Sequence, residues 1–400
     1  MASRNGLSEK KALIIGCGIA GPVLAMFLQR AGISAVIYEG RPAPRDEEGA
    51  FLNLAPNGLA VLDQLDVADQ VVAYGSPTTT TIFQNHRGKR LGENPETTTL
   101  IKRGLLNRAL REAAIDRGIT VEWNKRLVDV EITPQRTVVA RFEDGSEAHG
   151  DFLVGCDGIH SRTRRVVMPN APRPQYTGTI DCGAFTRLPH VKSTDGAMYM
   201  TFGLKGFFGY QVVPDGEIYW FENFWQEAEP DRAKLEAIST EDYKARLLEL
   251  HKDDHDPICD IIRSTEGLIA RWPIYDLPPL DTWHKGPVCL IGDAAHATSP
   301  HVGQGASMAL EDAIVLAKCL RDIGEIERAF ETFEKIRKER VERAVKQARR
   351  TGNQKSPGNA FGRAVRDLIL PFFLKQGVKQ VQWIYEYRVD WDEKVPALLG

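Results

Sequence analysis

The sequence predicts an α/β fold in which a parallel sheet flanked by helices is interrupted by an inserted, mainly antiparallel sheet and followed by a helical tail. Three observations predict it. A strand-helix-strand pattern begins at residue 12. Two later apolar runs, beginning at residues 152 and 288, each lead into a turn that contains glycine and aspartate. Between these runs lies an aromatic-rich stretch with the composition and turn punctuation of antiparallel strands.

Length and composition describe an ordinary globular chain. At roughly 150 residues per domain, 400 residues allow two to three domains. The apolar fraction of 42% and the charged fraction of 26% lie near globular averages. The 51 basic and 54 acidic residues leave a net charge of -3, which lacks the positive field that nucleic-acid binding needs. We therefore expect no nucleic-acid partner.

The cysteines and the apolar runs bear on location. The six cysteines lie at least 26 residues apart, so no Cys-x-x-Cys pair exists and we expect no metal site. No apolar run approaches the roughly 20 residues of a membrane span, and no secretory leader is recognisable. We expect reduced thiols, no membrane partner and a cytoplasmic protein.

The first elements in chain order form a β-α-β unit. A buried strand leads through a glycine-rich turn into a helix with apolar periodicity, and a second strand follows. The turn carries the Gly-x-Gly-x-x-Gly spacing at Gly16, Gly18 and Gly21. The strand, helix and second strand span 12–15, 23–31 and 35–38.

Each part of this unit has a physical role in holding a dinucleotide. Gly16 permits the tight turn, Gly18 lets the backbone approach a pyrophosphate, and Gly21 lets the helix pack closely on the strand. The first helical N–H groups, at Ile19 and Ala20, face the phosphates. The pattern therefore predicts a Rossmann-like dinucleotide-binding domain.

The second strand of the unit ends at an acidic residue. Glu39 lies 18 positions after the last glycine and would accept hydrogen bonds from the adenosine ribose. Arg41, nearby, is a candidate for a further nucleotide contact. The unit does not distinguish NAD from FAD, because both cofactors share the ADP half.

Two later motifs follow buried strands. The run 152–154 leads to Asp157-Gly158, which most simply forms a turn. The run 288–291 leads to Gly292-Asp293, where an aspartate at the carboxyl end of a strand can accept hydrogen bonds from a ligand. His296, just beyond, is expected to be a buried structural histidine.

A glycine-rich segment opens the next helix. Gly303-Gln304-Gly305 follows Pro300 and leads into a helix over 306–320. Its first N–H groups, at Gly305 and Ala306, could stabilise negative charge on a bound group.

The three motifs and their spacing resemble the single-component FAD-dependent aromatic hydroxylases, which include para-hydroxybenzoate hydroxylase, salicylate hydroxylase and the tetracycline-inactivating monooxygenases. The resemblance covers about 11–320. It implies bound FAD, with NADPH or NADH as a transient co-substrate, because no second Gly-x-Gly-x-x-Gly exists for a dedicated nicotinamide site.

The resemblance also implies roles for individual residues. Arg103, which begins a helix, would touch FAD near the ribityl chain, where Asp293 would accept from hydroxyls. Asp157 and Gly158 would help to hold FAD and guide the nicotinamide donor. Many relatives carry Asn where this chain has Ser307, which removes support for a side-chain contact to the flavin there. We assign cofactor binding to Gly16, Gly18, Ile19, Ala20, Gly21, Glu39, Arg41, Arg103, Asp157, Gly158, Asp293, Pro300, Gly303, Gln304, Gly305 and Ala306, and we name no catalytic residue.

The inserted segments would build the substrate side. Part of the aromatic cluster would form ordinary core and part would wall a pocket for a flat, hydrophobic molecule, and alternation alone does not say which part. Tyr210 and His301 are candidate polar groups of that pocket. The FAD-binding domain would comprise 1–75, 100–175 and 280–330, the substrate-binding sheet 76–99 and 176–279, and the C-terminal helical segment 331–400.

The tail is predicted to be helical. A surface helix is expected over 234–250, a long helix over 325–350 and a last one over 361–387. The long helix is rich in Lys and Arg with Glu interleaved, which favours a solvated face with i,i+4 pairs over an anion-binding surface.

The function implied by the resemblance is NAD(P)H-dependent hydroxylation of an aromatic, phenolic or polyketide-like molecule by O₂ through a C4a-hydroperoxyflavin, in a monomer or homodimer. A flavin-dependent halogenase is a rival hypothesis, although its Trp-x-Trp-x-Ile-Pro signature is absent. A flavin-linked reductase and a non-catalytic FAD-binding module also stay open as hypotheses.

Overall fold

A mainly parallel sheet forms the centre of one end of the molecule. The computed structural model describes residues 10–47, 49–300, 303–353 and 360–395. Six strands lie in the order β16-β17-β10-β1-β2-β6, and all neighbours run parallel except β16 and β17. The expected β-α-β unit is present, with the helix α1 beginning a few residues earlier than expected. These elements are β1 (Lys11–Ile15), α1 (Ala20–Arg30), β2 (Ser34–Tyr38), β6 (Thr120–Glu122), β10 (Phe152–Gly155), β16 (His284–Lys285) and β17 (Val288–Leu290).

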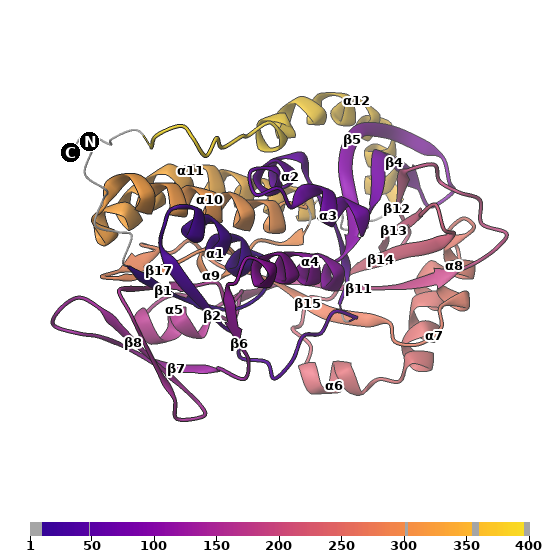
Figure 1. Cartoon of the computed structure of the whole chain (residues 1–400). Coiled ribbons are helices and arrows are strands. Elements are labelled where there is room, and N and C mark those ends of the chain that lie inside the picture. The colour runs from indigo at the N-terminus through magenta and orange to yellow at the C-terminus, as the bar shows by residue number, and fades with distance from the viewer. Residues whose placement is uncertain (1–9, 48, 301–302, 354–359, 396–400) are drawn as a thin grey trace.

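Strand alternation directs successive side chains of the parallel sheet into two different layers. Ala12 and Ile14 pack into the larger core beneath the helices, whereas Leu13 and Ile15 pack toward a small three-stranded sheet. Figure 1 shows α10 and α11 lying together beside α1. The helical layer contains α1, α2 (Pro56–Asp63), α3 (Ala68–Ala73), α4 (Arg103–Asp116), α10 (Gly305–Ile323) and α11 (Ile326–Asn353); the other layer contains β7 (Leu127–Ile132), β8 (Val138–Phe142), β9 (Glu147–Gly150) and α5 (Arg162–Val167).

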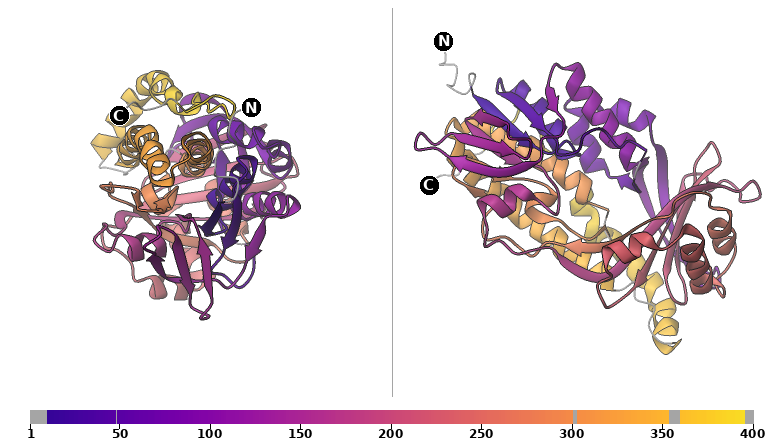
Figure 2. Two further views of the ribbon diagram at one scale, coloured as in Figure 1. Left: turned by 60° about the vertical axis from the view of Figure 1, so that its left-hand side comes forward. Right: turned by 90° about the horizontal axis from the view of Figure 1, so that it is seen from below.

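The second large sheet has eight strands in the order β15-β11-β14-β13-β12-β4-β5-β3 and is antiparallel except where β12 pairs with β4. Figure 2 shows it at the opposite end of the molecule from the parallel sheet. It also takes in residues 51–54, which lie outside the segments expected to form it. Its strands are β3 (Phe51–Leu54), β4 (Ser76–Asn85), β5 (Arg90–Lys102), β11 (Gln175–Arg187), β12 (Ala197–Phe202), β13 (Phe207–Val212), β14 (Glu217–Trp225) and β15 (Ala270–Asp276).

Three short helices cover one face of this sheet, and we call the opposite face the open face. The helices are α6 (Arg232–Ala237), α7 (Thr240–His251) and α8 (Ile258–Ser264). The single helix expected over 234–250 is two helices, because Ile238 is extended and the Ser239 side chain caps the start of α7. Their apolar residues pack with Phe208 and Trp220 of the sheet.

The aromatic cluster is divided between the two faces. Phe208 and Trp220 stack in the helix-covered core with ring centroids 5.5 Å apart. Tyr210 lies in the same core, stacked on Tyr199. The expectation that Tyr210 is a pocket polar group is therefore wrong, since its strand position points it toward the helices. His301, the other candidate, lies outside the described residues.

The last helix joins the two halves. α12 (Ala360–Tyr385) extends from the helical layer to β5 of the eight-stranded sheet (Figure 1), and Leu370 packs beside Phe202 and Phe207 of the open face. None of the helices in the part of the chain that the structure describes is both long enough and apolar enough to cross a bilayer.

The long helix α11 is not simply a solvated charged face. The Arg337 side chain is fully buried, with its guanidinium 2.7 Å from a Glu311 oxygen and 2.8 Å from an Asp312 oxygen of α10. Arg340 also bonds Glu311, through two nitrogens. The expectation of a solvated face is wrong at these two positions, because their partners lie on a different helix far away in the sequence.

Removal of the buried cation should destabilise the fold. Arg337→Leu would leave the Glu311 and Asp312 carboxylates buried with too little compensation, which costs about 3–5 kcal/mol. We expect that loss in the free energy of unfolding measured by urea denaturation. Lys346→Leu is the matched control on the same helix, because Lys346 is exposed and 3.9 Å from Glu342; it should change stability by less than about 1 kcal/mol. Equal effects of the two variants would contradict this assignment.

Candidate cofactor site

The predicted motifs meet at one edge of the parallel sheet. Strands β17, β10, β1 and β2 are consecutive neighbours, and each carries one motif at its carboxyl end. The Gly16 N–H donates to the Tyr38 carbonyl at 2.8 Å, and the Cys156 N–H donates to the Ile15 carbonyl at 2.8 Å. Ligands of open α/β sheets bind at such an edge. Figure 1 labels β17, β1 and β2 in this part of the molecule, with α1 and α10 next to them; β10 lies between β17 and β1.

The three glycines of the first loop differ in what surrounds them. Gly16 has a φ of +107°, and a Cβ there would lie 2.6 Å from the Cys156 carbonyl oxygen. A Cβ on Gly21 would lie 2.1 Å from the Gly16 oxygen. A Cβ on Gly18 would meet nothing within 4 Å. Packing alone therefore requires Gly16 and Gly21, whereas at Gly18 the structure leaves open space, as a closely approaching ligand would require.

Glu39 is fixed against the glycine loop. One carboxylate oxygen accepts from the Cys17 N–H at 2.8 Å and the other from the Arg41 N–H at 2.9 Å. The side chain is half-buried, and each oxygen keeps a further lone pair for a ribose hydroxyl. The Arg41 side chain is exposed beside it. Ile19 and Ala20 stand at the start of α1, as expected.

Asp157 is occupied by the chain itself. One carboxylate oxygen accepts from the Ser161 hydroxyl at 2.5 Å, and the other accepts from the Arg162 and Thr163 N–H groups at 2.8 and 2.9 Å. These bonds cap the start of α5. Gly158 has a φ of +75°, which the turn requires. The geometry accounts for Asp157 without a ligand, and its contact with FAD stays a prediction.

Arg164 joins two of the motifs. Its buried guanidinium donates to the Ala294 carbonyl at 2.7 Å and to the Ile159 carbonyl at 2.6 Å. Ile159 belongs to the Asp157-Gly158 turn and Ala294 follows Asp293. No local sequence pattern predicts this link, because Arg164 and Ala294 lie 130 residues apart.

Asp293 is the available carboxylate of the site. It begins the short helix α9 (Asp293–His296), is half-buried, and accepts no hydrogen bond from any described residue. A Cβ on Gly305 would lie 4.0 Å from its Oδ1 atom, so the carboxylate faces the start of α10. Arg103, at the start of α4, is exposed and its side chain likewise has no described partner.

His296 is the buried structural histidine that the sequence predicts. Its Nε2 atom lies 2.5 Å from the Asp312 carboxylate, which also accepts from the Gly292 N–H at 2.9 Å. Burial by itself raises the pKa of Asp312, but His296, Arg337 and these hydrogen bonds lower it to about 2. The turn before Asp293 is thereby anchored to α10.

The segment before α10 and the first turn of this helix hold several buried polar atoms that have no partner among the described residues. They are the Thr298 and Ser299 hydroxyls, the Gln304 Nε2 atom and the Ser307 hydroxyl. Such orphaned atoms cost free energy unless a ligand or water satisfies them. The nearby predicted residues Pro300 and Gly303 are exposed, and the Gly303 N–H donates to the Pro300 carbonyl at 2.9 Å.

Gln304 and Ser307 are held from the side of α2. The Asn57 amide donates to the Gln304 carbonyl oxygen at 3.0 Å and to Glu311 at 2.7 Å. A Cβ on Gly58 would lie 2.6 Å from the Ser307 hydroxyl, so this small residue allows α10 to approach α2. Sequence reasoning missed Asn57 and Glu311, because neither lies in a motif.

Open space at Gly18, an Asp293 carboxylate without a described partner, the starts of α1 and α10, and the orphaned polar atoms around the start of α10 fit an extended dinucleotide that carries a flavin. Glu39 would hold its ribose. The residues present therefore fit FAD.

Another buried cluster with shifted pKa values lies away from this edge. His251 bonds Glu222 at 2.7 Å and Asp254 at 2.8 Å, and all three side chains are inaccessible. Burial alone lowers the pKa of His251, but attraction to Glu222 and hydrogen bonds to both carboxylates raise it to about 10. The cluster lies on the helix-covered face of the eight-stranded sheet, where it links β14 to the end of α7. Among the residues that can be described, no three His, Cys, Asp or Glu side chains are arranged to hold a metal ion.

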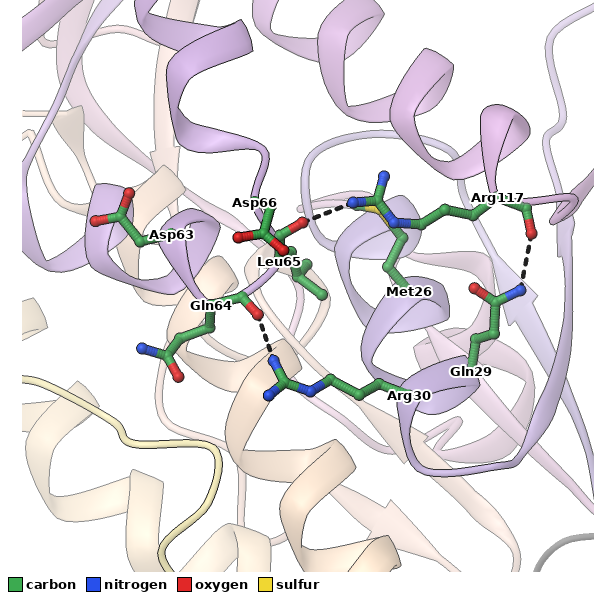
Figure 3. Close-up of a pocket in the computed structure, with 8 residues that line it drawn as sticks. All are labelled: Met26, Gln29, Arg30, Asp63, Gln64, Leu65, Asp66 and Arg117. Carbon is green, nitrogen blue, oxygen red and sulfur yellow. Dashed lines mark hydrogen bonds between the residues drawn. The ribbon is translucent and has the colours of Figure 1, made fainter.

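A surface groove of about 580 Å³ lies at the far end of α1 from the glycine loop (Figure 3). Arg117 donates to the Leu65 carbonyl at 2.6 Å, and Gln29 donates to the Arg117 carbonyl at 2.8 Å. These bonds tie α1, α4 and the end of α2 together. The groove contains none of the motif residues and is separate from the cofactor site.

The fold and the site define a flavoprotein in which a parallel sheet carries the dinucleotide edge and a second large sheet carries a cluster of aromatic side chains. The chain matches the FAD binding domain family over residues 9–348 and belongs to that family. It is an FAD-dependent monooxygenase. The resemblance to FAD-dependent hydroxylases and the α/β fold expected from the sequence are both confirmed.

Individual relatives agree over nearly the whole chain. The chain is 30% identical to the aurachin C monooxygenase/isomerase of Stigmatella aurantiaca, covering 90% of this chain and 93% of the relative. It is 29% identical to an FAD-dependent urate hydroxylase of Klebsiella oxytoca, covering 85% and 89%. The structure of Klebsiella pneumoniae HpxO with FAD and uric acid aligns with a TM-score of 0.84 at 23% identity, covering 95% of this chain and 99% of that one.

Two glycine substitutions should separate ligand binding from folding. Gly18→Ala should leave the thermal unfolding of the apoprotein unchanged and weaken FAD binding about tenfold or more, because the methyl group enters the space left for the pyrophosphate. Gly21→Ala should destabilise the apoprotein by about 1–3 kcal/mol or more, because its methyl group meets the Gly16 oxygen. Calorimetry and FAD titration of the apoprotein measure both effects. Unchanged FAD affinity in Gly18→Ala would refute the assignment of this loop.

Proposed function

We propose that this monooxygenase uses NADPH or NADH and O₂ to hydroxylate a small, flat aromatic, phenolic or polyketide-like molecule. One observation carries the proposal. The dinucleotide edge, with Glu39 and Asp293 available to a ligand, belongs to the same molecule as an aromatic sheet face that no α6–α8 helix covers. The names of the relatives, a urate hydroxylase among them, support it.

Bound FAD would supply the activation of O₂ after reduction by the nicotinamide donor. The loop from Gly16 to Gly21 and the first N–H groups of α1 would hold the pyrophosphate, and Glu39 the adenosine ribose. Asp293 would accept hydrogen bonds from the ribityl hydroxyls, with Arg103 nearby. The N–H groups of Gly305 and Ala306 at the start of α10 would stabilise negative charge on the pyrimidine edge.

The open face would orient the substrate and exclude water. Phe51, Tyr219 and Phe221 lie edge to face there, with ring centroids 5.5 Å apart for Phe51 and Tyr219 and 6.2 Å for Phe51 and Phe221. Aromatic walls of this kind hold flat ligands by contact area and by ring edges. The protein would contribute to the chemistry by positioning the substrate, excluding water and stabilising charge on the flavin. We assign no general base.

We also propose that the protein acts in the cytoplasm as a monomer or homodimer. All six cysteines are free thiols in the structure, four of them buried. Burial raises the pKa of Cys17 to about 12, which keeps the thiol beside the cofactor site protonated and unreactive. This suits a reducing compartment.

Oxygen transfer is the direct test. In the presence of a matching phenol or polyketide, the protein should accelerate NAD(P)H oxidation and place one atom of isotopically heavy O₂ in the product. Mass spectrometry reads the label, and hydrogen peroxide release measures uncoupling. The matched control is Asp293→Ala, which should fold normally but bind FAD at least about tenfold more weakly, because it removes the available carboxylate. Purified protein without flavin, or products without label across a broad panel, would refute the function.

A further inference from the structure

The centre of the open face carries no charged side chain among the described residues. Met200, Phe207 and Phe221 share this face, because in β12, β13 and β14 they alternate with residues that point to the helices. A Cβ on Gly209 would lie 2.2 Å from a ring carbon of Phe221, so the ring packs directly against the backbone of β13 where no side chain intervenes. The surface is a smooth apolar floor.

The polar side chains next to the centre of this floor, on β13 and β4, are neutral. Gln211 points to the open face and is 1% exposed. Its amide nitrogen donates to the Pro77 carbonyl at 2.9 Å, and its oxygen accepts from Thr78 at 2.7 Å. The Thr78 hydroxyl also lies 3.1 Å from the Asn53 oxygen. Amides and hydroxyls of this kind suit a neutral hydroxyl or carbonyl on a ligand.

The cations around the floor are already paired. Lys102 lies 2.9 Å from the Glu217 carboxylate and 4.4 Å from the centroid of the Phe185 ring. Arg366 of α12 lies 2.9 Å from Asp367 and over the Phe202 ring. A ligand anion would therefore have to compete with a carboxylate for either cation.

A carboxylate on the face itself also disfavours anions. Asp181 of β11 points to the open face, half-buried, and accepts from the neutral Asn223 amide. Arg103 has no described side-chain partner, but the proposed function assigns it to FAD. An anionic ligand placed on this floor would lose water without gaining a cation, which is costly.

We propose that the substrate is an uncharged, largely apolar ring compound, and that carboxylated aromatic acids are poor ligands. This inference rests on the proposed function, since it describes the substrate of the same site. The enzyme would discriminate against carboxylated ligands in two ways. Among the described residues, no unpaired cation is available on the floor to compensate the cost of desolvating the ligand carboxylate, and Asp181 repels it.

Matched acid and ester pairs test the proposal in the FAD-loaded enzyme. The probes are 3-hydroxy-2-naphthoate and its methyl ester, together with 2-hydroxybenzoate and its methyl ester. Within each pair the shape is similar and only the acid is charged at neutral pH. We expect each ester to bind at least about tenfold more tightly, from the change in flavin absorbance, and to accelerate flavin reduction by NADPH or NADH more strongly.

A charge variant makes the test specific to this face. Met200 is half-buried on the floor, so Met200→Lys places a cation there, and Met200→Leu is the neutral control. Met200→Lys should reduce or reverse the preference for the ester, whereas Met200→Leu should keep it. Flavin content and thermal unfolding verify that both variants are folded and loaded.

The outcomes separate the two levels of the proposal. The neutral-substrate inference is overturned if the wild-type enzyme binds the acids more tightly or binds none of the esters. The proposed function still holds in that case, provided that NAD(P)H reduces the flavin and O₂ is consumed. An unchanged ester preference in Met200→Lys places the discrimination elsewhere and also overturns it. Absence of FAD, or of any NAD(P)H oxidation, would instead refute the function itself.

Discussion

Because β17, β10, β1 and β2 run parallel as neighbours, their carboxyl ends emerge at one edge, and every motif of the cofactor site depends on that arrangement. Segments that begin near residues 16, 39, 157 and 292 become adjacent through the pairing of their strands, and the Glu39 and Arg164 side chains add hydrogen bonds between them. The close approaches at Gly16 and Gly21 are the steric condition for this edge, since any Cβ at either position would push the loop away from its neighbouring backbone.

Hydrogen bonds and ion pairs from α10 and α11 anchor this edge. Asp312 accepts from Gly292 and bonds His296, and its other oxygen bonds Arg337 of α11. Glu311, the preceding residue, bonds Arg340 of α11 and Asn57 of α2. Two adjacent acids on α10 therefore join α2 and α11 to the turn that carries Asp293. The charge network therefore fixes the turn that carries Asp293, in addition to the glycine motifs themselves.

The features that depend on residues close together in the sequence were predicted correctly. The β-α-β unit, the turns after β10 and β17 and the start of α10 all follow from glycine spacing and apolar runs. Tyr210 was misassigned because alternation separates two faces of a strand without saying which one helices cover. Arg337 was misassigned because its partners lie 25 and 26 residues earlier, on another helix. Asn57 and Arg164 act through partners more than a hundred residues away, and no local pattern predicts such contacts.

The eight-stranded sheet has a consequence for how such a protein changes over generations. Along β13 and β14, alternate residues hold the helix-covered core, and the residues between them form the open face. If the open face holds the ligand, as proposed, a substitution there can alter ligand preference, while the alternate residues of the same strands maintain the helix-covered core. The HpxO structure keeps this architecture at 23% identity. A sheet with one side committed to the core and the other to the proposed ligand can change its specificity without losing its fold.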